Sequence, residues 1–262
     1  MDKSEVKVVI LCGGKGTRIR EITETIPKPL VPIGEMPILW HIMKGYASQG
    51  YKNFILCLGY KGDLIRNFFL NYVNHNRDLT INLKSGEIHA SNGSNEDWNV
   101  TMINTGMGSQ TGKRLGLVKK YLENDEYFML TYGDGVSDVQ IDKILEFHKN
   151  SKVTGTITGI RASSKYGQVK TDDSGIAVHF AQYPLLDDRI NGGFMVLNRE
   201  FLDHPMLFEN RPIEDAVEDF IKLRKIAVYF HDGFWHCMDT PQHHEQLNSI
   251  WNKGEVPWKT WQ

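Results

Sequence analysis

Cysteine is scarce in this sequence, which has only three in 262 residues. Cys12, Cys57 and Cys237 are too few and too far apart to form a disulfide framework or a Cys-x-x-Cys zinc site. His231 and His236 lie near Cys237, but these side chains lack the spacing of a zinc ligand set. The scarcity excludes disulfide-rich secreted domains, and it predicts that Cys12 and Cys57, which lie in apolar runs, are small core residues.

A marked excess of one charge and a long apolar run are also missing. The 30 Lys and Arg residues nearly balance the 32 Asp and Glu residues, so the net charge is −2 and we expect no nucleic-acid partner. No segment approaches the ~20 apolar residues of a membrane span. Met1–Glu5 is polar and mixed in charge, so we expect no signal peptide. These absences predict a cytoplasmic protein that does not bind membranes.

What remains is an ordinary globular composition, 40% hydrophobic and 24% charged. No internal repeat and no low-complexity linker divides the chain. We therefore expect one domain over residues 1–262, with a first half of roughly 1–150 and a second half of 151–262 that ends in a helix.

Strands and helices alternate in the first half. Continuous apolar runs predict buried strands at Val6–Cys12, Asn53–Gly59 and Tyr127–Tyr132. Helical patterns lie between and after them, beginning at Pro37, spanning Leu64–Val73, and near Thr111–Glu123 and Val139–Lys149. This alternation predicts a Rossmann-like, mostly parallel sheet with helices on both faces.

The second half has shorter elements. Strands are expected at Val153–Ile160, Gly167–Thr171, Ile176–Phe180, Gly193–Leu197 and Ile226–Phe230, and helices at Ile213–Leu223 and after Thr240. The short strands predict an antiparallel or mixed extension of the sheet. The predicted fold class is thus α/β, with a mixed, mostly parallel sheet and a small antiparallel appendage.

The first strand ends in Cys12-Gly13-Gly14-Lys15-Gly16-Thr17-Arg18. Glycines allow backbone N–H groups to approach phosphate oxygens, and the cations that follow favour an anionic ligand. Neither the P-loop nor the dinucleotide-binding pattern fits these residues. The motif alone is equally compatible with a solvated strand–helix turn.

Pro27-Lys28-Pro29 follows closely and holds one lysine on a restricted backbone. Gly133-Asp134-Gly135 ends a later strand. Ligands bind at the carboxyl ends of parallel strands, so the glycine loop and Asp134 are expected on the same rim.

Gly-Gly-x-Gly-Thr-Arg followed by Pro-Lys-Pro resembles the sugar-phosphate nucleotidyltransferase family, and the resemblance extends over nearly the whole chain. It is closest to the glucose-1-phosphate cytidylyltransferase branch. The motifs that carry this likeness are Pro37–Met43, Leu58–Gly62, Trp98–Thr101, Thr131–Val136, Asn191–Phe194, Met238–Thr240 and VPWKTW at 256–261.

The resemblance implies an enzyme that uses Mg²⁺ to join a nucleoside triphosphate to a sugar phosphate. It makes Asp134 and Asp239 the metal-binding pair and assigns catalytic roles to Arg18, Lys28 and Asp134. Taken alone, Asp134 could equally be a turn residue and Asp239 a residue near a helix cap.

The same likeness implies a nucleotide site and favours CTP, because Trp98–Thr101 matches the cytidylyltransferase branch. Arg114 is the preferred ligand contact in its segment, although a solvated first helical turn would also explain it. Lys15 is the least certain of the loop cations. The expected nucleotide-binding residues are Leu11, Gly13, Gly14, Gly16, Thr17, Arg18, Lys28, Thr111, Gly112, Arg114 and Gly133.

The acceptor half departs from the family pattern. Members usually carry a lysine shortly before Asn-Gly-Gly that binds the acceptor's phosphate; here Gln182 or Tyr183 replaces it, and Arg211 replaces a glutamate. Either Arg211, Arg189 or Lys165 compensates, or the acceptor differs. The expected acceptor-binding residues are Tyr166, Gly167, Gln182, Tyr183, Asn191, Gly192 and Arg211.

The leading hypothesis is cytidylyl transfer from CTP to a sugar phosphate of the glucose-1-phosphate class, giving a CDP-sugar for polysaccharide synthesis. Transfer to another sugar phosphate or to a polyol phosphate is the first alternative. A non-catalytic nucleotide-binding subunit is the second. The aromatic C-terminal tail suggests a homo-oligomer.

Overall fold

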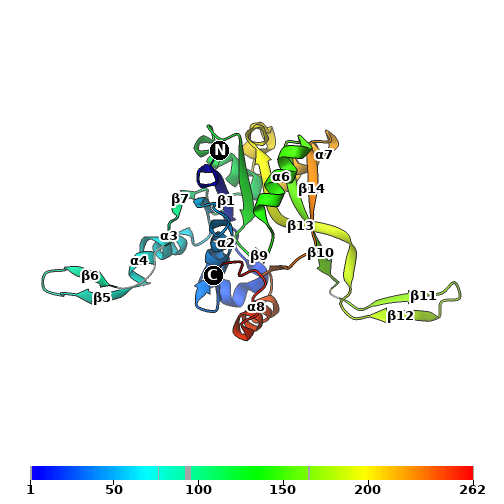
Figure 1. Ribbon diagram of the computed structural model, residues 1–262, viewed down its shortest axis with the longest axis horizontal. Coiled ribbons are helices and arrows are strands. Elements are labelled where there is room, and N and C mark those ends of the chain that lie inside the picture. Colours follow the sequence, from blue (N-terminus) through cyan, green and yellow to red (C-terminus); the bar gives the residue numbers. More distant parts are fainter. Residues whose placement is uncertain (1, 76, 92–95, 165, 262) are drawn as a thin grey trace.

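A computed structural model describes residues 2–75, 77–91, 96–164 and 166–261 of the chain. Its centre is a seven-stranded sheet in the order β14-β10-β13-β8-β1-β4-β7 (Figure 1). The strands are β1 (Lys7–Cys12), β4 (Asn53–Leu58), β7 (Asn99–Asn104), β8 (Tyr127–Tyr132), β10 (Gly155–Ser163), β13 (Leu185–Asn198) and β14 (Ile226–His231).

One strand of this sheet runs against the others. β1 is parallel to β4 and β8, β4 to β7, and β10 to β14, whereas β13 is antiparallel to both β8 and β10. The predicted α/β class with a mixed, mostly parallel sheet is therefore confirmed. The segments predicted as strands at Val153–Ile160 and Gly193–Leu197 belong to this main sheet, not to an appendage.

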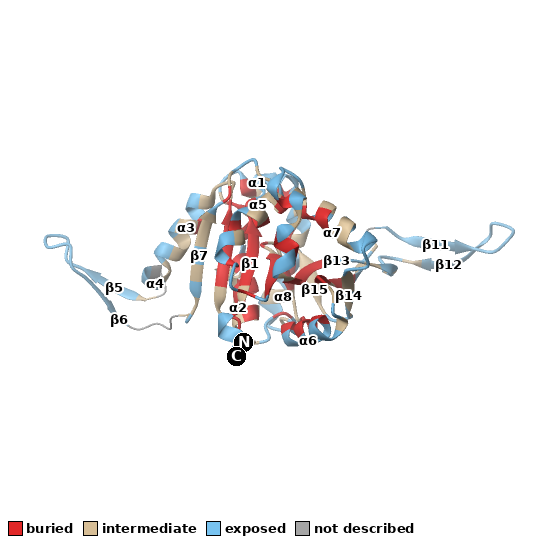
Figure 2. Cartoon of the chain, turned by 90° about the horizontal axis from the view of Figure 1, so that it is seen from above, coloured by how far each residue is buried: buried red, intermediate tan, exposed pale blue. Residues whose placement is uncertain are grey.

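Helices cover both faces of the sheet, and the alternation of side chains along β1 shows why. Val8 and Ile10 point into a core formed with α2 (Ile38–Ala47), α6 (Ile141–Ser151) and α8 (Pro241–Lys253). Val9 and Leu11 point into a second core formed with α5 (Thr111–Val118) and α7 (Ile213–Lys222). The buried residues lie mainly on the central strands and on parts of the helices beside them (Figure 2). A strand covered on both sides needs apolar residues along its buried length, as β1 has from Val8 to Cys12.

The edge beyond β4 differs from the sequence-based expectation. The helix expected over Leu64–Val73 is divided at Asn71 into α3 (Gly62–Leu70) and α4 (Tyr72–His75). β7 was not predicted as a strand because it is an edge strand, partly exposed along its length, and its polar residues break the apolar pattern.

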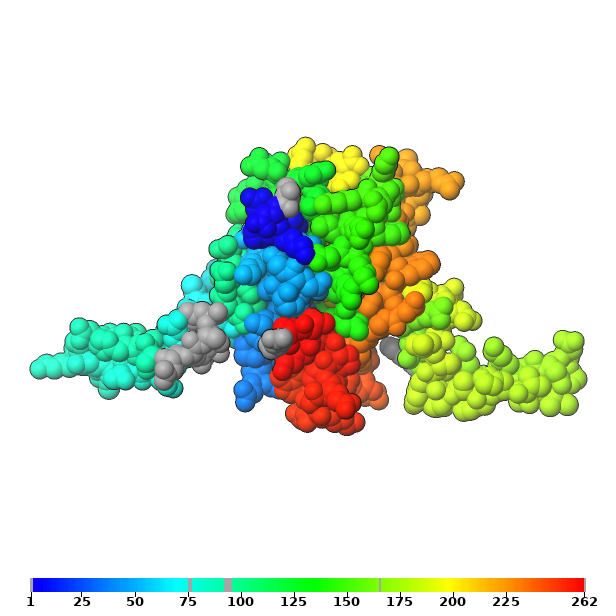
Figure 3. Space-filling view, viewed as in Figure 1, coloured from blue at the N-terminus to red at the C-terminus, as the bar shows by residue number. Residues whose placement is uncertain are grey.

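Two hairpins project from opposite sides of the molecule (Figure 3). One consists of β5 (Asp78–Ile81) and β6 (Ile88–Ser91), which the sequence did not predict. The other consists of β11 (Gln168–Thr171) and β12 (Ala177–Ala181), close to the expected short strands. The hairpin of β11 and β12 is the antiparallel appendage.

The aromatic tail packs within its own chain. Trp258 is only 1% exposed and belongs to the core beside His41, with Trp251 and Trp261 close to the same imidazole. His41 Nε2 donates a hydrogen bond to the carbonyl of Ile33, and burial lowers the pKa of the ring to about 4. Trp258 is therefore a core residue, and the expectation that the tail makes subunit contacts does not apply to it.

Candidate active site

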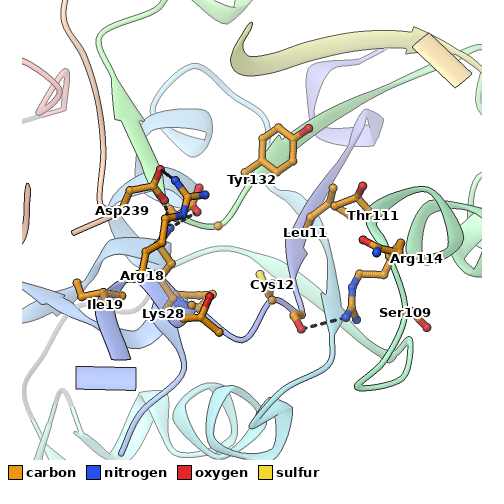
Figure 4. Close-up of a pocket in the computed structure, with 18 residues that line it drawn as sticks. Leu11, Cys12, Arg18, Ile19, Lys28, Ser109, Thr111, Arg114, Tyr132 and Asp239 are labelled. Carbon is orange, nitrogen blue, oxygen red and sulfur yellow. Dashed lines mark hydrogen bonds and ion pairs between the residues drawn. The ribbon is translucent and has the colours of Figure 1, made fainter. Parts of the chain in front are cut away.

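A cavity of about 280 Å³ opens at the carboxyl ends of β1 and β8 (Figure 4). The glycine loop, the start of α5 and the turn after β8 contribute its walls. Most of the predicted nucleotide and metal residues line it: Leu11, Gly13, Gly14, Gly16, Thr17, Arg18, Lys28, Thr111, Arg114, Gly133, Asp134 and Asp239. Gly112 is not among the lining residues; it packs against the carbonyl of Arg211.

A small two-stranded sheet brings the two aspartates together. β9 (Gly135–Ser137) directly follows Asp134, and β15 (Trp235–Cys237) ends just before Asp239. The strands pair antiparallel with Cys237 opposite Gly135, and the Met238 N–H donates to the carbonyl of Asp134 at 2.8 Å. This pairing closes the distance between two residues that are far apart in sequence.

Lys28 lies between these aspartates. Its ammonium is 2.6 Å from Asp134 Oδ2 and 2.6 Å from Asp239 Oδ1. Arg18 Nη1 contacts the other oxygen of Asp239 at 2.7 Å. Burial opposes the charge of Lys28, but the two carboxylates outweigh burial and raise its pKa. Burial likewise opposes ionisation of Asp239, yet its hydrogen bond to Lys28 and the charges of Lys28 and Arg18 lower its pKa.

The same carboxylates fit a small divalent cation. Asp134 Oδ2 and Asp239 Oδ1 both contact one ammonium nitrogen, so they face a common point and are close enough to share one ion. Carboxylate oxygens are the ligands of hard cations, and Mg²⁺ commonly takes one or two of them together with substrate oxygens. The described residues contain no group of three or more His, Cys, Asp and Glu side chains placed to hold a metal. The pair therefore suits a metal that completes its coordination with substrate and water.

Arg114 forms the opposite end of the cavity (Figure 4). Its side chain is buried, and its guanidinium donates to the carbonyls of Gly13, Leu58 and Gly106 and to Thr105 Oγ1 over 2.7–3.2 Å. It fastens the glycine loop to the ends of two neighbouring segments. A solvated first-turn arginine, the alternative left open by the sequence, is excluded because Arg114 is 3% exposed.

Two glycines of the loop are required for different reasons. Gly16 has φ +61°, in the left-handed region, and its carbonyl accepts a hydrogen bond from Thr23 Oγ1 at 3.0 Å. A Cβ at Gly13 would lie 2.0 Å from Arg114 Nη1, whereas a Cβ at Gly14 would meet nothing within 4 Å. Gly13 is thus needed for internal packing, and Gly14 leaves backbone open to the cavity.

The predicted acceptor residues on the second hairpin lie away from the cavity lining. Gly167 packs against Phe180 and Gln182 where β11 and β12 begin and end. Tyr166 is exposed beside this hairpin, and Tyr183 is exposed with φ +53°.

The cations considered as replacements for the family's lysine have partners of their own. Arg211 pairs with Asp215 at 2.7 Å, and Arg189 pairs with Asp232 at 2.7 Å. Neither lines the cavity, and Lys165 lies outside the described residues.

Asn191 and Gly192 lie within β13, next to Gly193, where an added Cβ would lie 2.8 Å from the ring of Tyr132. The Tyr132 hydroxyl donates to Glu214 Oε1 at 2.8 Å. The Gly192 carbonyl accepts from Trp235 Nε1 at 2.7 Å. Tyr132, which lines the cavity, therefore lies beside the segment of β13 that contains the expected acceptor residues.

Sequence reasoning missed several lining residues. Tyr132 directly precedes the Gly133-Asp134 turn, so its place at the end of a predicted buried strand was a usable signal. Ser109 and Gln110 immediately precede the expected helix at Thr111, where the N-terminus of a helix meets the rim. Pro29, Cys12 and Ile19 complete the lining but carry no chemical signal.

Comparison with known proteins gives a consistent result. A family model described as nucleotidyl transferase matches residues 7–244. The chain is 40% identical to a probable glucose-1-phosphate cytidylyltransferase of Bacillus subtilis, over 98% of this chain and 100% of that protein. It is 41% identical to the glucose-1-phosphate cytidylyltransferase of Salmonella typhi with the same coverage.

Solved structures share the fold. HddC from Yersinia pseudotuberculosis complexed with GMP-PN superposes with a TM-score of 0.68 at 22% identity, covering 94% of this chain and 99% of that one. A putative glucose-1-phosphate thymidylyltransferase from Bacillus anthracis gives a TM-score of 0.67 at 16% identity, covering 94% of each chain. Within the described residues, no helix combines the length and apolar character needed to span a membrane.

Proposed function

The chain belongs to the nucleotidyl transferase family, and from this premise we propose that it transfers a cytidylyl group from CTP to glucose 1-phosphate. The products are CDP-glucose and pyrophosphate. The choice of both substrates is supported by relatives with that activity in their names, at 40% and 41% identity over essentially the whole chain. The single observation that carries the proposal is the cavity in which the glycine loop, Lys28, Asp134 and Asp239 meet.

The reaction joins two anions. An oxygen of the acceptor's phosphate attacks the α-phosphorus of CTP, a new P–O bond forms, and the bond from the α-phosphorus to the bridging oxygen of the leaving pyrophosphate breaks. Such a transfer depends on positioning and on neutralising charge more than on proton removal. A bound Mg²⁺ would supply positive charge to the phosphate oxygens, with Asp134 and Asp239 as its protein ligands.

The chain's own cations would share that task. We assign Arg18 and Lys28 to the triphosphate, because both are cations of the cavity lining and lie beside the two aspartates. The backbone of Gly14 and Gly16 and the hydroxyl of Thr17 would hold phosphate oxygens. Leu11, Thr111 and Arg114 would surround the nucleoside. Roughly the first half of the chain, residues 1–150, would bind the nucleotide, and residues 151–262 would bind the acceptor. The reaction would take place in the cytoplasm, where nucleoside triphosphates are available.

Pyrophosphate release tests this proposal. With CTP, Mg²⁺ and glucose 1-phosphate, the purified protein should release one pyrophosphate for each CDP-glucose formed, and UTP or dTTP should be poorer donors. Tight CTP binding without release for any acceptor would instead indicate a nucleotide-binding subunit. Absence of both binding and release would contradict the proposal.

A different phosphorylated acceptor is the second candidate, and one observation favours it. Gln182 and Tyr183 are uncharged where the family places a lysine, and Arg189 and Arg211 are paired with aspartates outside the cavity lining. The same assay with other sugar phosphates and with polyol phosphates decides it. A kcat/KM for one of these at least tenfold above that for glucose 1-phosphate would establish the different acceptor.

We also propose that the chain forms a homo-oligomer through its projecting hairpins. Phe180 and Val178 share one apolar face of the second hairpin and are each 64% exposed, while the paired Lys170 and His179 lie on the other face. The first hairpin pairs Ile81 with Ile88, both exposed. A projecting hairpin has no core of its own in which to bury such side chains, so an exposed apolar face on it indicates contact with another protein. A second copy of the chain offers the matching apolar face.

Light scattering after size exclusion measures the mass of the oligomer. The wild-type mass should be at least twice the 30.0 kDa of one chain, and a variant carrying both Val178→Asp and Phe180→Asp should have a lower mass. A Lys170→Glu, His179→Glu variant, changed on the opposite face, should keep the wild-type mass. A wild-type mass of 30.0 kDa would contradict the proposal.

A further inference from the structure

The Lys28 ammonium occupies the point that the two candidate metal ligands face. It lies 2.6 Å from one oxygen of Asp134 and 2.6 Å from one oxygen of Asp239. Its side chain is 11% exposed, compared with 72% for Arg18, which contacts only the outer oxygen of Asp239. The two cations therefore differ: Lys28 lies between the carboxylates, and Arg18 covers one of them from the solvent side.

The backbone restricts where this lysine can go. Lys28 begins a 3₁₀ turn after Pro27, with Pro29 following, and its Cβ packs below the glycine loop, where a Cβ at Gly16 would lie 3.3 Å from it. A side chain anchored in this way can move its ammonium by rotating its terminal bonds, but its stem stays under the loop. The nearest alternative partners for the ammonium are then anions bound in the cavity.

The Lys28 ammonium and a metal ion would compete for the same position, because they need the same volume and the same negative charges. A cation bound by these oxygens would sit about 2.1 Å from them, within the volume that the ammonium fills. Lys28, Arg18, Asp134 and Asp239 are two positive and two negative charges, so they are already balanced. A free divalent cation would add two uncompensated positive charges to a partly buried group, whereas a cation that arrives with a triphosphate would bring negative charge with it.

We propose that Lys28 is an internal competitor for the divalent cation, so that the carboxylate pair binds metal poorly by itself and well only together with the triphosphate. The inference rests on the metal pair of the proposed function. When phosphates enter, they give the ammonium new acceptors and free the carboxylates. The competition makes the two ligands mutually dependent: metal increases nucleotide affinity and nucleotide increases metal affinity by the same factor.

Binding of Mn²⁺ in the absence of nucleotide tests the competition. Electron paramagnetic resonance measures free Mn²⁺ directly and does not require activity. The Lys28→Met variant should bind Mn²⁺ at least tenfold more tightly than the wild type. Lys28→Arg, which keeps the charge, should bind Mn²⁺ as weakly as the wild type, so the pair of variants separates charge from packing. If Lys28→Met does not fold, Lys28→Gln replaces it.

Three further variants define what each outcome means. Lys44→Met removes another partly buried lysine, paired with Glu96 at 2.8 Å and outside the cavity lining, and should leave Mn²⁺ affinity unchanged. Adding Asp134→Asn or Asp239→Asn to Lys28→Met should abolish the tight Mn²⁺ binding. Unchanged affinity in Lys28→Met, with a lowered melting temperature, would show that the lysine is only structural and would overturn the inference.

The outcome for the proposed function is separate. If Lys28→Met binds Mn²⁺ no better than the wild type, but Asp134→Asn weakens Mn²⁺ binding in the presence of CTP, the competition fails and the metal pair stands. If tight Mn²⁺ binding in Lys28→Met persists without either aspartate, the metal pair is wrong and the competition fails with it. Cytidylyl transfer is then still decided by pyrophosphate release.

Discussion

Replacing Asp134 by asparagine should lower kcat by roughly a hundredfold or more, the scale of losing one preorganised electrostatic group. The amide keeps the shape of the side chain but removes the charge that would bind Mg²⁺, and it leaves Lys28 with Asp239 as its remaining carboxylate partner. The effect should be seen in kcat for pyrophosphate release at saturating CTP and acceptor. The loss of kcat should persist at high Mg²⁺ concentration, because added Mg²⁺ does not restore the missing carboxylate ligand.

An aspartate eight residues later provides the matched control. Asp142, in the first turn of α6, forms an ion pair with Lys3 at 2.6 Å near the surface. Asp142→Asn should leave kcat within twofold of the wild type. Circular dichroism on both variants would show that each is folded. Turnover near the wild-type value in Asp134→Asn, with ordinary Mg²⁺ dependence, would remove Asp134 from the proposed role.

The sheet and one wall of the cavity could be predicted from the sequence because their signals are local. An apolar run such as Val8–Cys12 favours a strand covered on both faces, and glycines at its end mark the ligand rim. The turn at Asp134 follows a run of the same kind. Parallel pairing of β1 with β8 then places both ends on one rim, as the register of Leu11 with Tyr132 shows.

The partnership of Asp134 with Asp239 had no local signal. It depends on β9 and β15, each three residues long, and strands this short show no periodicity. Only family resemblance suggested the pair. The position of Lys28 between the two carboxylates was equally hidden, because the sequence shows a rigid lysine but not the charges around it.

Arg114 shows a second limit of prediction from the sequence, because its burial could not be foreseen. By pattern, an arginine in the first turn of a helix is a solvated cation, disfavoured there by the helix dipole. Its burial follows from tertiary structure, since the carbonyls of Gly13, Leu58 and Gly106 converge on it from three segments. No sequence pattern shows that backbone carbonyls, and not carboxylates, neutralise a buried guanidinium.

The convergence on Arg114 predicts that the two adjacent glycines of the loop respond very differently to alanine. Gly13→Ala places a Cβ 2.0 Å from Arg114 Nη1 and must displace the guanidinium from its buried acceptors. Losing several hydrogen bonds to a charged group should cost on the order of 3–5 kcal/mol of unfolding free energy. Gly14→Ala meets nothing within 4 Å and should cost less than about 1 kcal/mol. Urea unfolding measures both.

A double-mutant cycle shows whether Arg114 is the cause. In an Arg114→Ala background the obstructing side chain is gone, so Gly13→Ala should then cost less than about 1 kcal/mol. Gly59→Ala should not be rescued in this way, because its Cβ would also lie 2.7 Å from the backbone carbonyl of Gly13. If Gly13→Ala costs as much without the arginine as with it, backbone conformation and not packing against Arg114 explains the glycine. The glycine loop would then depend on contacts other than those of Arg114 for its position in the cavity wall.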